Sequence, residues 1–112
     1  MATKTKQDRT REVFDWLQQE FPTRRACSLT FKVTPKEGKD TFQGYVIETH
    51  RHGIEVVIDS RLRGYTMIDT LLHEYSHIKS RRTKHGVVFR AWEERIDSAF
   101  WDWRKRDDTF RA

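Results

Sequence analysis

Apolar side chains recur at helical spacing in three segments of the chain, and strand-like segments lie between the first two. The first helical segment, residues 9–21 (RTREVFDWLQQEF), places four large apolar residues on one face: Val13, Phe14, Leu17 and Phe21. Thr10 is a candidate N-cap, and Pro22 marks the end of this helix because proline cannot continue one. Residues 1–8 carry no such pattern, and we expect them to form a frayed, polar start.

The other two helical segments lie in the second half of the chain. Residues 66–80 and residues 87–104 each carry an apolar stripe, and the polar residues 81–86 (RRTKHG) separate them. The first stripe consists of Ile68, Leu71, Leu72, Tyr75 and Ile78, and the second of Val88, Trp92, Ile96, Ala99, Phe100 and Trp103. Trp101 falls off the second stripe, and we expect it at the surface.

Three segments between the first two helices are rich in β-branched and aromatic residues, as strands are. They are residues 27–33 (CSLTFKV), 41–50 (TFQGYVIETH) and 53–60 (GIEVVIDS). Short linkers of turn-forming residues join them, which predicts an antiparallel meander. One face of the last strand is more polar than the other, as in a sheet covered on one side. The pattern predicts a single α+β domain, residues 1–112, with a three-stranded antiparallel sheet.

Composition limits the classes of protein to which the chain can belong. It has no apolar run of the about 18 residues that a membrane span needs, and its N-terminus has no apolar segment of a signal peptide. We therefore expect a cytoplasmic monomer that does not bind membranes. Cys27 is the one cysteine, which excludes an internal disulfide and a cysteine-based zinc ribbon. The net charge of +5 favours acidic partners, including DNA or another nucleic acid, although a solvated surface explains it equally well.

Two histidines and a glutamate lie on one edge of the second helix, in residues 70–80 (TLLHEYSHIKS). At about 100° per residue, His77 falls about 40° from His73 and Glu74 about 100° from it, whereas the apolar stripe falls between about 140° and 260°. The histidines therefore face away from the core, one turn apart. Two imidazoles at this spacing can bind one zinc ion, and His-Glu-x-x-His on a helix is a signature of zinc hydrolases. Glu74, beside the metal, can then act as the general base of a hydrolysis.

A catalytic zinc needs a third protein ligand and an open position. His85 follows His77 by eight residues, and Gly86 next to it would permit a tight turn that returns His85 to the metal. Glu93 and Glu94 on the last helix are the alternatives. We favour His85 as the third ligand, and Glu93 over Glu94 if a carboxylate takes its place.

Residues 71–92 (LLHEYSHIKSRRTKHGVVFRAW) resemble the SprT-like metallopeptidase domain, the family that includes the Spartan proteases. That family combines a helical HExxH with a later histidine in an HGxxF context, matched here by His85, Gly86 and Phe89, and the similarity covers roughly residues 42–103. The resemblance implies one zinc ion bound by His73, His77 and His85, with Glu74 as general base. It also implies a zincin-like domain that cleaves proteins, including proteins crosslinked to DNA. The cysteine content departs from the family, because many SprT proteins carry a C-terminal zinc ribbon.

Other residues near the motif have candidate roles. Tyr65, in the turn before the second helix, is a candidate to stabilise the oxyanion of the reaction, whereas Tyr75 falls on the apolar stripe and is expected in the core. A basic group after the motif is a candidate for contacts to substrate or nucleic acid: Lys79, Arg81, Arg82 and Lys84. Cations at the end of a helix also stabilise its dipole, which is the simpler explanation of the same residues. His50 and His52 are a second histidine pair, without a third ligand nearby in the sequence.

The sequence thus predicts a zinc metallopeptidase, with a protein or peptide as substrate. An extended substrate would pair with an exposed strand edge, for which residues 53–60 are our candidate. Two alternatives use the same residues. One is a metal-dependent hydrolase of a phosphate-containing small molecule, and the other is a non-enzymatic module that binds nucleic acid and contains structural zinc.

Overall fold

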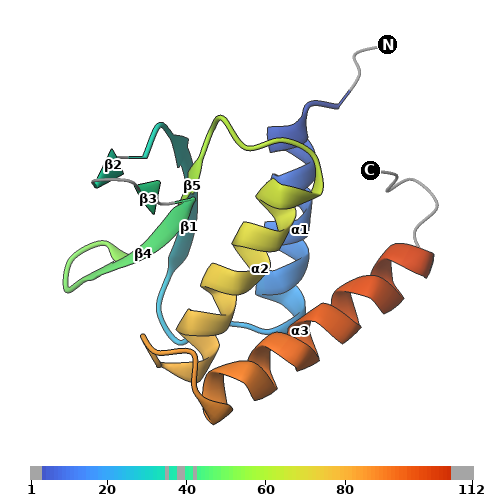
Figure 1. Ribbon diagram of the computed structural model, residues 1–112. Helices are drawn as coiled ribbons and strands as arrows, with labels where there is room; N and C mark the ends of the chain where they lie inside the picture. Colours follow the sequence, from blue (N-terminus) through green and yellow to red (C-terminus); the bar gives the residue numbers. More distant parts are fainter. Residues whose placement is uncertain (1–3, 35, 38–39, 42, 107–112) are drawn as a thin grey trace.

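The structure, a computed structural model, describes residues 4–34, 36–37, 40–41 and 43–106 (Figure 1). The helices are α1 (Lys6–Glu20), α2 (Tyr65–Ser80) and α3 (Val87–Arg106), and the strands are β1 (Cys27–Lys32), β2 (Lys36–Glu37), β3 (Asp40–Thr41), β4 (Gly44–Thr49) and β5 (Gly53–Asp59). The α+β class and the order of a helix, a sheet and two further helices are as the sequence predicts.

Helix α1 begins earlier than the sequence pattern suggested, so the expected N-cap at Thr10 is wrong. The Thr5 hydroxyl accepts a hydrogen bond from Asp8 N at 3.0 Å, and Thr5 N donates to the Asp8 carboxylate at 3.1 Å. This reciprocal pair is a capping box, which satisfies two backbone donors at a helix start. Thr10 is instead buried inside the helix, where its hydroxyl donates to Lys6 O. Of the expected frayed start, residues 6–8 are therefore helical, and residues 1–3 lie outside the described residues.

The main sheet is mixed, which corrects the expected antiparallel meander. Its order is β1-β5-β4, so that β5 is central, parallel to β1 and antiparallel to β4. Leu29 of β1 and Val46 of β4 are both paired with Val56 of β5. The central position suits β5 because its apolar run, residues 56–58, is fully buried.

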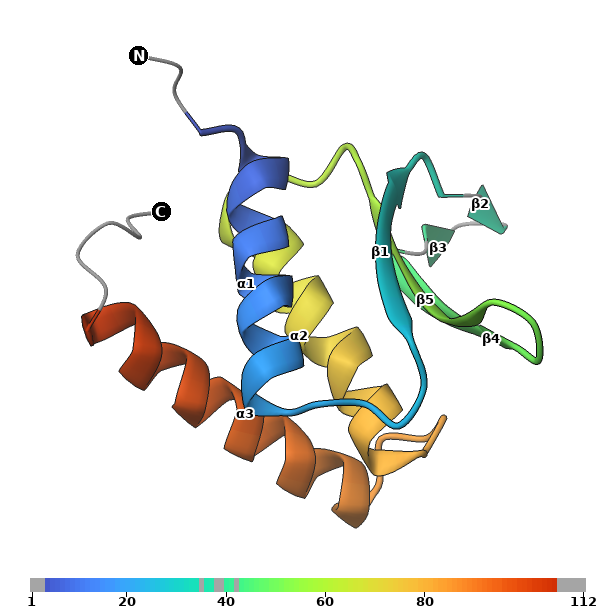
Figure 2. The same cartoon turned by 180° about the vertical axis from the view of Figure 1, so that it is seen from behind.

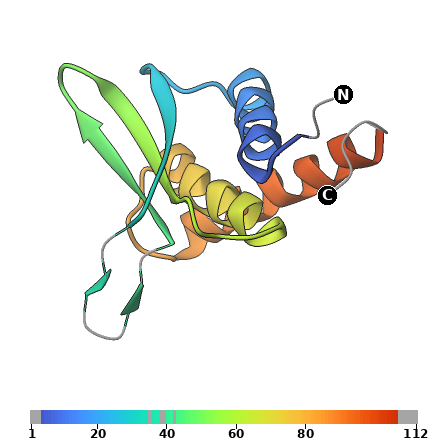
Figure 3. The same ribbon diagram turned by 90° about the horizontal axis from the view of Figure 1, so that it is seen from above.

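The linker between β1 and β4 explains why these two strands are not neighbours. It forms a small ladder of its own, in which β2 pairs with β3 (Lys36 with Thr41, Glu37 with Asp40), rather than a tight turn. Figure 3 shows this ladder extending beyond the end of the main sheet. The chain thereby crosses to the far edge of the sheet, and β5 fills the space between β1 and β4. Residues 35, 38–39 and 42 of the predicted turn and strand lie outside the described residues.

The three helices lie on one side of the sheet (Figures 2 and 3). Helix α2 lies in the middle of the domain, in contact with α1, α3, β4 and β5, and α3 packs against α2. The predicted stripe of α2 is confirmed, since Ile68, Leu71, Leu72 and Tyr75 are at most 3% exposed and Ile78 is partly buried against them. Within the described residues, no helix is long and apolar enough to cross a membrane.

The stripe of α3 is confirmed except at its start. Ile96 and Phe100 are buried, and Trp92, Ala99 and Trp103 pack against the core, whereas Trp101 is 45% exposed as expected. Val88 is 44% exposed, contrary to the prediction, and Phe89 is 1% exposed in its place. The reason is that the first turn of α3 lies beside the histidines at the end of α2 rather than over the core, and Phe89 contacts those histidines.

An ion pair with a buried carboxylate closes the end of β5. The Asp59 side chain is 4% exposed and accepts hydrogen bonds from the Arg61 guanidinium, at 2.7 Å and 3.0 Å, and from the Thr34 hydroxyl at 2.9 Å. These bonds, with the Arg61 guanidinium as the largest cause, hold the pKa of Asp59 well below its usual range. The sequence pattern had assigned Asp59 to the polar face of a half-covered strand. It is instead the polar anchor that joins β1, through Thr34, to the chain leaving β5.

We expect Asp59→Asn to lower the free energy of unfolding by about 2 kcal/mol at neutral pH, because the substitution removes charge-assisted bonds in a buried place. A carboxyl whose pKa is lower in the folded protein stabilises it above the unfolded pKa of about 4, and this contribution is lost as the pH falls further. Urea unfolding at pH 7 and pH 3 measures both effects. The difference between the wild type and the variant should be smaller at pH 3 than at pH 7 but should not vanish, because it is lost completely only as the pH falls through the lowered pKa of folded Asp59.

The control is Asp15→Asn, because Asp15 is exposed on α1, and its effect should stay within about 0.5 kcal/mol. An Asp59→Asn variant as stable as the wild type at pH 7 would contradict the role of this pair.

Candidate metal centre

Helix α2 presents His73 and His77 on the edge that faces away from its buried stripe. Both side chains are partly exposed, and their ring centroids lie 5.0 Å apart. The spacing of four residues places the two rings one turn apart on the helix. Because the opposite side of α2 is packed in the core, rotation of the helix about its axis would expose apolar residues. The rings are thus held in place by packing elsewhere on the same helix.

The chain turns sharply after α2 and returns toward it. Arg81 ends the helix with a left-handed backbone (φ 57°), a conformation common at helix C-termini. The Nδ1–H of His77 donates to the carbonyl oxygen of Arg82 at 2.6 Å, which holds the returning loop against the helix. The tight turn expected at Gly86 is therefore made at Arg81, and no atom lies within 4 Å of where a Gly86 Cβ would be.

This return brings His85 to the other two histidines. The ligand atoms of His73, His77 and His85 all lie within 4.8 Å of one another. His85 Nε2 is 3.2 Å from His77 Nε2, close to the about 3.3 Å between two imidazole nitrogens that bind one tetrahedral zinc at 2.0–2.1 Å. Three imidazoles with an open fourth position are a ligand set of catalytic zinc sites. The three residues therefore fit a single metal ion.

Glu93 of α3 lies behind this cluster, in contact with His73. Its Oε2 is 2.9 Å from His73 Nδ1, and because a carboxylate can only accept, Nδ1–H is the donor. Because Nδ1 of His73 is used in this bond, its Nε2 remains available on the side of the cluster. The bond from His77 Nδ1 to Arg82 O leaves Nε2 of His77 available in the same way. Glu93 thus has the position of a residue that orients a ligand, rather than that of the third ligand. Sequence reasoning weighed Glu93 only as a ligand, and Glu94 is exposed.

Phe89 forms the inner wall of the cluster. Its ring centroid lies 4.4 Å from that of His77, 4.8 Å from that of His85 and 5.0 Å from that of His73, and the residue is 1% exposed. An apolar wall keeps the three rings together and excludes water from behind them. Apart from its place in the HGxxF motif, nothing in the sequence indicated that Phe89 contacts all three histidines.

Glu74 is half-buried beside His73. Burial raises the pKa of its carboxyl above the ordinary value, and the nearby His77 and His73 act in the opposite direction. Among the residues that the structure describes, none forms a hydrogen bond with this carboxylate, so its oxygens remain available to water or a substrate. Glu74 also lines a cavity of about 480 Å³, with Asp69 and His73 of α2 and Gln43 and Gly44 of the chain entering β4.

The two tyrosines lie away from the histidines. Tyr75 is fully buried as expected, and its hydroxyl donates to Phe21 O at 2.5 Å and accepts from Gln18 Nε2 at 2.9 Å. Burial raises the pKa of the Tyr75 hydroxyl far above its usual value. Tyr65 is at the other end of α2, about 12 Å along the helix axis from His73, with its ring against Trp101. The geometry therefore does not support Tyr65 as the oxyanion stabiliser.

Three of the four predicted basic residues line a second cavity, of about 740 Å³, that His77 also borders. They are Lys79, Arg81 and Arg82, and the loop before β1 adds Arg24 and Arg25. Lys84 is exposed and does not border this cavity. The contribution of Arg24 and Arg25, about 50 residues earlier in the chain, was missed because no local pattern links them to the motif.

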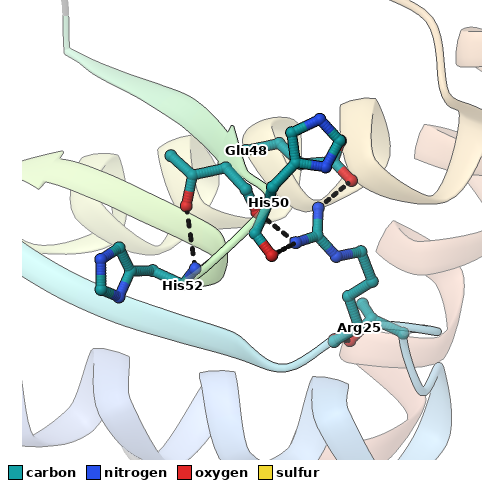
Figure 4. Close-up of polar contacts among 6 residues, drawn as sticks. Arg25, Glu48, His50 and His52 are labelled. Carbon is teal, nitrogen blue, oxygen red and sulfur yellow. Dashed lines mark hydrogen bonds and ion pairs between the residues drawn. The ribbon is translucent and has the colours of Figure 1, made fainter.

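The second histidine pair forms no comparable group. Figure 4 shows His50 and His52 in the turn between β4 and β5, with their rings pointing in different directions. Both residues are exposed, and the contacts at this turn involve their backbone: His50 O accepts from Arg25, and His52 N donates to Thr49 Oγ1.

Comparisons of the chain with protein-family models, with curated proteins and with solved structures gave no significant match. The case for a function therefore rests on the site itself.

We expect metal analysis to find about one zinc per chain, and His85→Ala to lose it, because the residue would supply one of three ligands. Glu93→Gln should still bind one zinc at saturation, but with an affinity about 10- to 100-fold lower, since the side chain orients His73. Zinc content after dialysis and titration against a competing chelator measure the two effects.

Glu94→Gln, on the exposed side of the same helix, is the matched control and should bind zinc like the wild type. If His85→Ala kept its zinc and Glu93→Gln lost it, Glu93 would be the third ligand.

Proposed function

We propose that the protein is a zinc-dependent metallopeptidase of SprT-like type. The observation that carries this proposal is the convergence of three imidazoles beside an unpaired glutamate. The glutamate, Glu74, lies on α2 with two of the three histidines. A structural zinc site needs neither an open fourth coordination position nor a base next to the metal. The resemblance of residues 71–92 to SprT-like domains supports the same class.

His73, His77 and His85 would hold the metal, which when bound polarises a carbonyl and makes water a nucleophile near neutral pH. Glu74 accepts the proton of the attacking water and returns it to the leaving amine. Glu93 and the carbonyl oxygen of Arg82 accept from Nδ1–H of His73 and His77, so that Nε2 of each ring would be free to hold the metal. Each of these residues has a separate task in the same hydrolysis.

The strand available to an extended peptide is β4 rather than β5. The prediction that residues 53–60 form an exposed edge is wrong, because β5 lies between β1 and β4. Asp59 N donates to Gln43 O, so in this antiparallel pair the alternate residues Gly44, Val46 and Glu48 direct their backbone groups to the open edge. A peptide could add a strand there.

The edge of β4 also runs close to the histidines. A Cβ on Gly44 would lie 2.9 Å from Thr70 Cγ2 of α2, so glycine permits the strand and the helix to approach closely. A cavity lies at each end of β4. His73 and Glu74 border the cavity near its start, and His77 borders the cavity near its end. A peptide along β4 would therefore pass the metal centre.

Glu74→Gln should keep the fold and the bound zinc but lower kcat for a peptide by about 10²- to 10⁴-fold, the usual contribution of a general base. The assay compares zinc-loaded wild type and variant on unfolded protein, with and without DNA, and on nucleotides. Glu20→Gln, exposed on α1, is the control for the loss of a carboxylate.

Undiminished peptide cleavage by Glu74→Gln would exclude the mechanism. Hydrolysis of nucleotides but not of protein would instead favour the phosphate-hydrolase alternative.

Val46→Pro should lower kcat/KM for extended peptides by about tenfold, since proline removes a backbone donor that a paired substrate needs. The ladder to β5 should survive, because the N–H of Val46 points away from β5. Ile47→Pro is the contrast, because its N–H faces β5 and its loss should unfold the sheet, as thermal melting would show. A folded Val46→Pro variant with wild-type kcat/KM would exclude β4 as the substrate strand.

A further inference from the structure

The cavity of about 740 Å³ next to His77 has a strongly positive lining. It lies between the end of β4, the end of α2 and the loop that joins α1 to β1. Five cationic side chains line it, against the single carboxylate of Glu48: Arg24, Arg25, Lys79, Arg81 and Arg82. Residues far apart in the sequence thus place an excess of positive charge at one end of the metal centre.

Two of these cations already have partners. Arg25 donates to the Glu48 carboxylate at 3.0 Å and to the carbonyl oxygens of Thr49 and His50 (Figure 4). Lys79 donates to Pro22 O at 2.8 Å and lies over the ring of Trp92. The guanidinium groups of Arg24, Arg81 and Arg82 have no hydrogen bond or ion pair with any residue that the structure describes, so they are available to an anionic ligand.

The charges in this group repel one another. Arg24, Lys79 and Arg81 line the same cavity, and Glu48, the carboxylate among its lining residues, is already bonded to Arg25. Uncompensated like charges in a concave site favour the binding of an anion, because the ligand supplies the missing countercharge.

The shape and lining of the cavity favour a peptide carboxylate over a nucleic acid. Among the described residues that line the cavity there is no Trp, Tyr or Phe, the large rings on which a base would stack. Val46, Ile54 and Ile78 give it an apolar side that suits the methylene groups of a glutamate. Val46 and Glu48 also belong to the open edge of β4, where a peptide backbone would pair.

We propose that this cavity is the subsite for an acidic side chain of the peptide substrate, with Arg81, Arg82 and Arg24 as the residues that determine specificity. The inference rests on the proposed peptidase function. Because His77 is part of the cavity wall, the acidic residue lies within a few positions of the bond that is cut. The cavity at the other end of the metal centre contains Asp69 and Glu74, so an acidic residue is favoured on one side of that bond only.

The first experiment uses zinc-loaded full-length protein and peptides that differ at one position. Glu, Gln or Lys is placed at each of the positions near the cut bond, on both sides, and kcat/KM is measured. On one side of the cut bond, kcat/KM for the Glu peptide should exceed that for the Gln peptide by about tenfold, because Glu gains a charge-assisted bond to arginine. The kcat/KM for the Lys peptide should be lower than that for the Gln peptide, because Lys is repelled by the arginines. The Glu preference should weaken as salt is added.

Variants link the preference to the cavity. The double variant Arg81→Gln with Arg82→Gln should bring the ratio of Glu to Gln close to one, and Arg82→Glu should favour Lys. Arg63→Gln, exposed in the loop before α2, is the matched control and should keep the wild-type ratio. Equal cleavage of the Glu and Gln peptides by the wild type would overturn the subsite while leaving the peptidase function intact.

A second experiment is independent of turnover. Zinc-loaded Glu74→Gln is titrated with a labelled acidic peptide, and the Gln peptide and a single-stranded oligonucleotide compete for it. The acidic peptide should bind more tightly than the Gln peptide, and the double variant Arg81→Gln with Arg82→Gln should lose this difference. That result supports the subsite even if the wild type cuts no peptide. In that case the proposed hydrolytic function fails but the subsite does not. Equal binding of the acidic and Gln peptides, or stronger competition by the oligonucleotide, would overturn the proposal.

Discussion

The hydroxyl group of Tyr75 sets the position of α2, on which the candidate metal centre depends. Tyr75 is fully buried, and its hydroxyl donates to Phe21 O at the end of α1 while Gln18 donates to it. It lies between His73 and His77 in the sequence but on the opposite side of the helix. A buried hydroxyl without these partners would be costly, so rotation of α2 about its axis is disfavoured. The same bond therefore fixes the direction in which both imidazoles point.

The segments that follow α2 supply the rest of the candidate metal centre. The left-handed turn at Arg81 and the bond from His77 to Arg82 O return the chain, which carries His85 to the cluster. Helix α3 then contributes Phe89 as an apolar wall and Glu93 as a partner of His73. Each candidate ligand thus comes from α2 or the loop after it, and the supporting contacts come from that loop (Arg82 O) and from α3 (Phe89 and Glu93). The three imidazoles are held by the core of the domain although they are partly open to solvent.

The surroundings of the centre differ in charge at its two ends. Carboxylates of Asp69 and Glu74 line the cavity near the start of β4, and cations line the cavity near its end. In an extended peptide successive residues are about 3.3 Å apart. Nearby side chains of one bound peptide would therefore lie in electrostatic potentials of opposite sign. In the proposed peptidase, such an arrangement would select substrates by the sign and the position of their charges. It would also give a role to Arg24, which is remote from the motif in sequence.

Local sequence determined the parts of this protein that depend on local geometry. The stripe of α2 and the phase of His73, Glu74 and His77 follow from helical periodicity, which needs no partner. The start of α1 was equally local, since Thr5 and Asp8 form a capping box, but the apolar pattern alone did not reveal it.

Tertiary structure decided what depends on contacts between distant segments. Three features join residues at least 20 positions apart: the parallel pairing of β1 with β5, the bond between Glu93 and His73, and the approach of Arg24 to Arg81. The first of them also leaves β4 at the edge of the sheet. Strand propensity does not specify a neighbour, because β1 could bury its apolar face beside either β4 or β5. Only the packed core of the whole domain selects one arrangement, and with it the partners of each charged side chain.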